Sequence, residues 1–188
     1  MLHAVMAVLA GAACSDSTTA PTTTWGAPLR IANEVPAPTG TGTATSTLGG
    51  SATVMVTGGG TAAGTIVYSL SFTGTPSSAI TAAHIHAGAD SAHGGGLTPA
   101  GTGSGVVRVL LCGTGGPACP AGAGDVPSTT VTYASGTTAV LGGTAGPPKT
   151  TMTFDGLAAA IKASNAYVNV HTTNNPGGEA RGQLVPLP

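Results

Sequence analysis

The chain has 188 residues, of which only 6% are charged and 3% aromatic, while 31 are glycine, and its formal net charge is −1 at pH 7. This length is enough for one domain with a hydrophobic core. Phosphate groups require clustered basic side chains, and the scattered basic residues here exclude nucleic acid as a partner.

The first fourteen residues, MLHAVMAVLAGAAC, form an apolar run too short to span a bilayer, so residues 1–14 are expected to be an export signal. Gly11, Ala12 and Ala13 before Cys14 are similar to a bacterial lipoprotein cleavage box, in which the cysteine becomes the lipidated first residue. The alternative is an ordinary secretory signal with an incidental cysteine. Residues 15–28, rich in Thr and Pro, are then expected to be a flexible tether.

Most of the remaining chain consists of short segments of strand-forming residues. After an extended entry segment at residues 31–38, which includes Glu34, strands are expected at residues 52–57, 65–73, 80–86, 105–111 and 128–133. Glycines 58–60 join the first two strands into a hairpin, and the second alternates cleanly between apolar and polar residues, so one of its faces lies in a core. The pattern predicts an all-β fold.

The two cysteines within this region also carry information. Cys112 and Cys119 enclose a Gly/Pro-rich turn that brings their sulfurs together, and an oxidising compartment favours a disulfide between them. A loop this short contributes about 2.5 kcal/mol to stability in the chain-entropy model. The alternative is a metal site, but the chain has no second cysteine pair to complete one.

One segment has the pattern of a helix. Asp155 is expected to be the N-cap of a helix over residues 156–164, in which Leu157 and Ile161 share one face and which Asn165 ends. A helix this short needs packing to be stable. We therefore expect it at one edge of the β structure, directly before the last hairpin.

The last hairpin, residues 167–183, contains most of the unusual chemistry of the sequence. On its first strand Tyr167, Asn169 and His171 share one face, because side chains alternate with a period of two. Glu179 and Arg181 are expected to share a face of the return strand with Gln183. We expect Glu179, Arg181 and Asn169 to form a buried polar network that orients His171. The alternative is an exposed salt bridge of little energetic value.

Three histidines form a candidate metal site. His84 and His86 are two residues apart on a strand and point to the same side, and His171 from a neighbouring strand would complete a three-imidazole site suited to copper or zinc. The alternative is that His84 and His86 hydrogen-bond with Glu179 and Arg181 inside the fold. Their spacing is also similar to the His-x-His of copper/zinc superoxide dismutases, with Asp90 and His93 in the following loop as possible additional ligands.

Catalytic motifs are missing from the sequence. It has no Gly-x-Ser-x-Gly elbow, phosphate-binding loop or dinucleotide fingerprint, and its six carboxylates are scattered. The sequence therefore indicates no catalytic residue and favours a protein that is not an enzyme.

Several segments together resemble a known family. They are Asn33-Glu34-Val35-Pro36, Ala83-His84-Ile85-His86-Ala87-Gly88, the loop from Cys112 to Cys119, Tyr167-Val168-Asn169-Val170-His171-Thr172 and Pro176-Gly177-Gly178-Glu179-Ala180-Arg181-Gly182-Gln183. Over residues 29–185 the chain resembles the CHRD domain, which is named from chordin and is widespread in bacterial secreted proteins. The resemblance implies an extracellular, single antiparallel β-sandwich of Greek-key-like type, with one short helix before the last hairpin.

The resemblance also bears on function. It implies no established enzymatic activity, and in chordin such domains belong to a protein that binds secreted growth factors. We therefore expect an exported module of the cell envelope or a secreted one, in contact with the membrane through a lipid anchor only, that binds an extracellular protein or surface partner. The alternative function is a secreted copper- or zinc-binding protein that uses His84, His86 and His171, of which a dismutase-like protein is one form. No oligomeric state is predicted.

Overall fold

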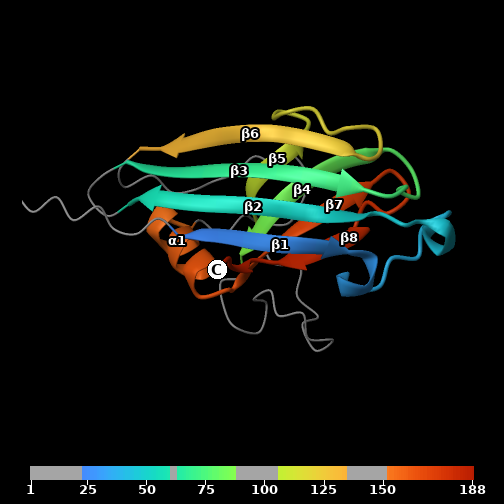
Figure 1. Cartoon of the computed structure of the whole chain (residues 1–188), viewed down its shortest axis with the longest axis horizontal. Coiled ribbons are helices and arrows are strands. Elements are labelled where there is room, and N and C mark those ends of the chain that lie inside the picture. The colour runs from blue at the N-terminus through green and yellow to red at the C-terminus, as the bar shows by residue number, and fades with distance from the viewer. Residues whose placement is uncertain (1–22, 60–62, 88–105, 135–151) are drawn as a thin grey trace, which may run out of the picture.

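The computed structural model describes residues 23–59, 63–87, 106–134 and 152–188 (Figure 1). Within these ranges the strands are β1 (Thr24–Arg30), β2 (Gly49–Gly58), β3 (Gly64–Thr73), β4 (Ile80–Ala87), β5 (Val106–Gly113), β6 (Gly124–Tyr133), β7 (Ala166–Thr172), β8 (Ala180–Gln183) and β9 (Val185–Pro186). The helix is α1 (Phe154–Lys162), and two short 3-10 turns are η1 (Ile31–Asn33) and η2 (Thr43–Thr45). The export signal, Cys14, Asp90 and His93 lie outside the described residues.

All the described strands belong to one antiparallel sheet. Their order is β5-β4-β7-β8-β1-β2-β3-β6, and β9 pairs with β1. In Figure 1 the strands β1, β2, β3 and β6 lie in front of β4, β5 and β7, so the sheet folds over onto itself into two layers. The connections from β3 to β4 and from β5 to β6 cross between these layers. The expected all-β fold with one short helix before the last hairpin is confirmed.

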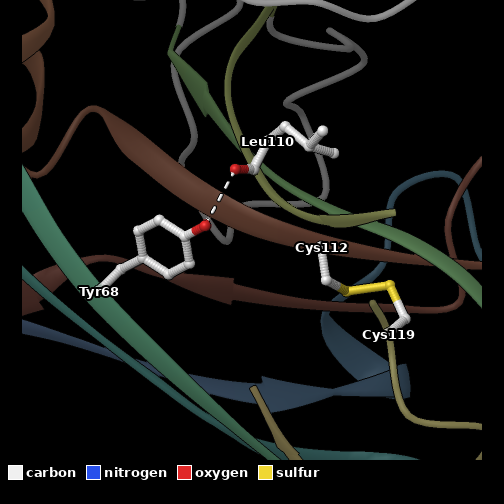
Figure 2. Close-up of a disulfide and its surroundings, with 4 residues drawn as sticks. All are labelled: Tyr68, Leu110, Cys112 and Cys119. Carbon is white, nitrogen blue, oxygen red and sulfur yellow. Dashed lines mark hydrogen bonds between the residues drawn. A yellow bond between two sulfur atoms is a disulfide. The ribbon is translucent and has the colours of Figure 1, made fainter. Parts of the chain in front are cut away.

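The core lies between the two layers. On β3 the alternate residues Ile66, Tyr68, Leu70 and Phe72 are buried, as the sequence pattern predicts. The hydroxyl of Tyr68 donates a hydrogen bond to the carbonyl oxygen of Leu110 on β5 at 3.4 Å, across the core (Figure 2). The hairpin of β2 and β3 is also confirmed, and its two strands pair along their whole length.

The expected disulfide is confirmed. Cys112 near the end of β5 is bonded to Cys119 in the loop that leads to β6, with the two Cα atoms 5.1 Å apart (Figure 2). Cys112 is fully buried in the core cluster. The disulfide therefore fixes the β5–β6 connection to the edge of the sheet.

The helix begins two residues earlier than expected. Thr153 is the N-cap, and its Oγ1 accepts a hydrogen bond from the backbone N–H of Gly156 at 3.1 Å. Asp155 therefore lies in the first turn and not at the cap. The earlier start buries Phe154 together with Leu157 and Ile161, so packing decides the boundary. At the other end Ser164 has a φ of 55°, the left-handed conformation expected for Asn165.

The N-terminal strand was missed by the sequence analysis. Residues 24–28 were expected to lie in the tether, but they form part of β1, which pairs with β2, β8 and β9. Trp25, Ala27 and Leu29 alternate into the core. A single turn of η1 then leads from β1 to Glu34, and this turn brings the carboxylate to the β7–β8 end of the sheet.

Candidate metal centre

Strand alternation on β4 and β7 places the three histidines on one face of the sheet. Ala83 and Ile85 are fully buried in the core, so His84 and His86 lie on the outer face of β4. In the antiparallel pairing His84 is opposite Asn169, His86 is opposite Tyr167, and Ala82 is opposite His171. Partners directly opposite each other point to the same side, so His171 lies diagonally across from His84 on that same outer face.

The three rings converge. The ring centroids of His84 and His171 are 5.0 Å apart, those of His84 and His86 are 5.9 Å apart, and those of His86 and His171 are 6.2 Å apart. One ring nitrogen from each histidine lies within 4.8 Å of the other two. Nitrogens bound to one tetrahedral ion lie roughly 3.4 Å apart. Small side-chain rotations are therefore enough to bring all three onto one ion.

His171 is held in one tautomer. Its Nδ1 is 2.9 Å from the carbonyl oxygen of Pro176. A carbonyl oxygen only accepts, so Nδ1 carries the hydrogen and Nε2 keeps its lone pair. This Nε2 and the Nδ1 of His84 are both buried and make no hydrogen bond within the described part of the chain. Buried polar atoms rarely remain without a partner, and an imidazole oriented through its other nitrogen is typical of a metal ligand.

Both rings are neutral near pH 7. Burial lowers the pKa of His84 to about 4, and His171 nearby lowers it further. Burial also lowers the pKa of His171, and the charge of Arg181 acts in the same direction, while the hydrogen bond to Pro176 opposes it. Because neutral imidazole is the form that binds metals, no proton has to leave these two rings before an ion binds.

Aromatic stacking orients the third histidine. The ring of His86 lies against Tyr167 with centroids 4.9 Å apart and planes 7° from parallel. The guanidinium carbon of Arg181 lies 3.9 Å from the centre of the same tyrosine ring. β7 lies between β4 and β8 in the sheet, so Tyr167 is placed between the histidine and the arginine.

Arg181 forms a buried ion pair with Glu34. The Nη2 of Arg181 is 3.3 Å from the Oε1 of Glu34, and their side chains are 4% and 1% exposed. Nη2 also donates to the carbonyl of Val35, and the Nδ2 of Asn169 donates to Glu34 at 3.5 Å. Burial raises the pKa of Glu34, while Arg181 lowers it. The sequence analysis missed Glu34 in this role, although it is the single charge of its segment.

Glu179 belongs to a different network, which differs from the expected pairing with Arg181. Its carboxylate accepts hydrogen bonds from the hydroxyls of Ser46, Ser77 and Thr172, from the backbone of Ser77 and from the Nδ2 of Asn175. The reason is positional. Glu179 lies in the bend before β8, so it does not follow the alternation of that strand. Of the expected network, only Asn169 and Arg181 share partners.

The comparisons with known proteins agree with the extent of the sheet. The family model of the CHRD domain matches residues 25–184, from β1 to the residue after β8. No curated protein and no solved structure matches the chain significantly. Within the described residues, no helix has the length and apolar character needed to cross a membrane.

Proposed function

Since the chain belongs to the CHRD domain family, we propose that it is an extracytoplasmic CHRD module that binds one copper or zinc ion through His84, His86 and His171. The observation that carries this proposal is the convergence of three imidazole nitrogens to within 4.8 Å on one face of the sheet. Imidazole suits both metals, and copper is favoured over zinc in a given nitrogen site.

The partners of the neighbouring charged groups support metal binding over a purely structural role. If the histidines served to fix the last hairpin, they would donate hydrogen bonds to Glu179 or accept them from Arg181. Glu179 instead bonds to hydroxyls and amides, and Arg181 pairs with Glu34. The Nδ1 of His84 and the Nε2 of His171 therefore have no hydrogen-bond partner among the described residues and are available to an ion.

Two features support the extracytoplasmic location. The disulfide between Cys112 and Cys119 is of a kind that persists in oxidising compartments. The apolar leader of residues 1–14 ends in Cys14, which in the proposal becomes the lipidated first residue of the exported protein. The membrane contact of the proposed module is this lipid anchor.

Metal analysis of the purified protein tests the function. After loading with Cu(II) or Zn(II) and removal of unbound ions, we expect elemental mass spectrometry to find about one ion per chain. The His84→Ala/His86→Ala variant is expected to lose this ion. His93→Ala removes a candidate additional ligand that lies outside the described residues, and it should retain the ion because the proposed site uses three other histidines. Equal metal content in the wild type and the double variant, with both folded by circular dichroism, would show that the cluster is not the site.

A further inference from the structure

We propose that the metal-loaded centre binds a small monovalent anion at an open fourth coordination position, an inference that rests on the proposed function. The first argument is the number of ligands. Copper and zinc sites usually have four ligands, and sites with three protein ligands leave the fourth position to water or a substrate. Within the described ranges the cluster contains three histidines and no carboxylate.

The second argument is the direction from which the ligands arrive. All three histidines project from the outer face of one strand pair, β4 and β7. Ligands from a single sheet face occupy one side of an ion. His84 and His171 are half-buried on this face, and the Nδ1 of His84 and the Nε2 of His171 have no hydrogen-bond partner among the described residues. The open position therefore points away from the sheet.

The third argument is charge. Three neutral imidazoles leave the two positive charges of the ion uncompensated. The two buried carboxylates among the described residues are already engaged, Glu34 with Arg181 and Asn169, and Glu179 with hydroxyl and amide donors. Charges interact strongly where water is partly excluded, and the charge of a bound ion dominates its surroundings. An anion is therefore a better fourth ligand than neutral water.

Arg181 strengthens this preference. Its guanidinium lies against Tyr167, which stacks on His86, so a positive charge is one aromatic ring away from a metal ligand. The ion pair with Glu34 fixes the guanidinium in this place. Arg181 acts here through its field and not as a ligand.

Azide titration of the Cu(II)-loaded full chain tests the inference. We expect a new charge-transfer absorption band that saturates at one azide per copper, together with a changed electron paramagnetic resonance spectrum. Arg181→Gln should weaken azide binding by about tenfold, and Arg181→Lys should restore part of it, because the charge returns without the planar guanidinium that stacks on Tyr167. His93→Ala should behave like the wild type.

The outcomes separate the two proposals. If one copper binds per chain but azide in excess leaves both spectra unchanged, the coordination sphere is closed by the chain itself, and the inference fails while the proposed function stands. If azide changes the spectra of His93→Ala but not those of the wild type, His93 closes the coordination sphere, and the inference fails in the same way. If no copper binds, both are overturned. Equal azide affinity in folded Arg181→Gln and in the wild type overturns the role given to Arg181. The open coordination position itself is tested by the wild-type titration, which needs no variant.

Discussion

At Arg181, a charge is kept almost completely away from water, with its carboxylate partner Glu34 equally buried. Removing one member of such a pair leaves the other buried and uncompensated. We therefore expect Arg181→Ala to lower the free energy of unfolding by about 3 to 5 kcal/mol. This is a large part of a typical domain stability of about 5 to 15 kcal/mol. Urea unfolding measures it.

Two further variants control this prediction. Arg30→Ala removes an exposed arginine at the position on β1 that pairs with Arg181, and it should cost less than about 1 kcal/mol. Glu34→Gln combined with Arg181→Ala should cost less than the sum of the single changes, because the neutral amide no longer needs a cation. If the losses in the free energy of unfolding are additive, or if Arg181→Ala has only a small effect, then Arg181 and Glu34 do not form a buried ion pair in solution.

The alternation of side chains along a strand explains why part of this site could be predicted from the sequence. Because residues two apart lie on the same strand face, His84 shares a face with His86, and Tyr167 and Asn169 share one with His171. It does not reveal Glu34, because its contact with Asn169 joins positions 135 residues apart. Contacts of this kind depend on which strands become neighbours, and local pattern contains no information about that.

Among the elements, the bend before β8 is held by one carboxylate. Glu179 joins the end of β7 at Thr172, the following turn at Asn175, the β3–β4 connection at Ser77 and the segment after η2 at Ser46. The turn it secures also contains Pro176, whose carbonyl orients His171. Glu179 thereby connects the stability of these loops to the geometry of the candidate metal centre.

The acid stability of the protein tests this connection. Burial raises the pKa of Glu179, but the hydrogen bonds from Ser46, Ser77 and Thr172 outweigh it and hold the pKa below its ordinary value of 4.5. A carboxyl group whose pKa is lower in the folded state adds stability above its unfolded pKa, and this stability is lost as the pH falls through the folded pKa. We therefore expect the wild type to lose more stability than Glu179→Gln between neutral pH and pH values below about 4.5.

Urea unfolding of the two proteins across this range provides the measurement. Glu34 has the opposite pKa shift, but it is present in both proteins and cancels in the comparison. Glu179→Gln should already be less stable at neutral pH, because the amide cannot accept all the hydrogen bonds of the carboxylate. Parallel stability profiles for the two proteins would count against the network.

The ends of the strands and the helix differ from the sequence prediction where packing, and not the local residue pattern, determines them. The strands of residues 65–73 and 80–86 were predicted within about a residue, since their alternation is clean. β1 was missed because a Thr- and Pro-rich composition indicates a linker even though Trp25, Ala27 and Leu29 alternate. The helix start shifted to Thr153 because burial of Phe154 extends the helix.

At the scale of the whole molecule, the candidate centre lies outside the core. Its histidines project from the outer face of β4 and β7, whereas the hydrophobic cluster fills the space between the two layers. The candidate centre is therefore built apart from the hydrophobic cluster. The fold supplies a fixed strand pair, and the residues on its outer face supply the chemistry.

The corrected start of the sheet also changes the geometry of the proposed lipid anchor. With β1 beginning at Thr24, the segment between Cys14 and the sheet is residues 15–23, nine residues instead of the expected fourteen of 15–28. Nine residues span at most about 30 Å when fully extended. If Cys14 is lipidated, the domain is held close to the membrane surface.

Metabolic labelling tests the anchor itself. Radiolabelled palmitate supplied to the native host should enter the wild-type protein and not a Cys14→Ser variant, because the thiol of Cys14 and the amino terminus that cleavage exposes are the proposed attachment sites. The Cys112→Ser/Cys119→Ser variant is the matched control, since it removes the other two cysteines and should keep its label. Label in both the wild type and Cys14→Ser, or in neither, would contradict lipidation at Cys14 and favour an ordinary secretory signal.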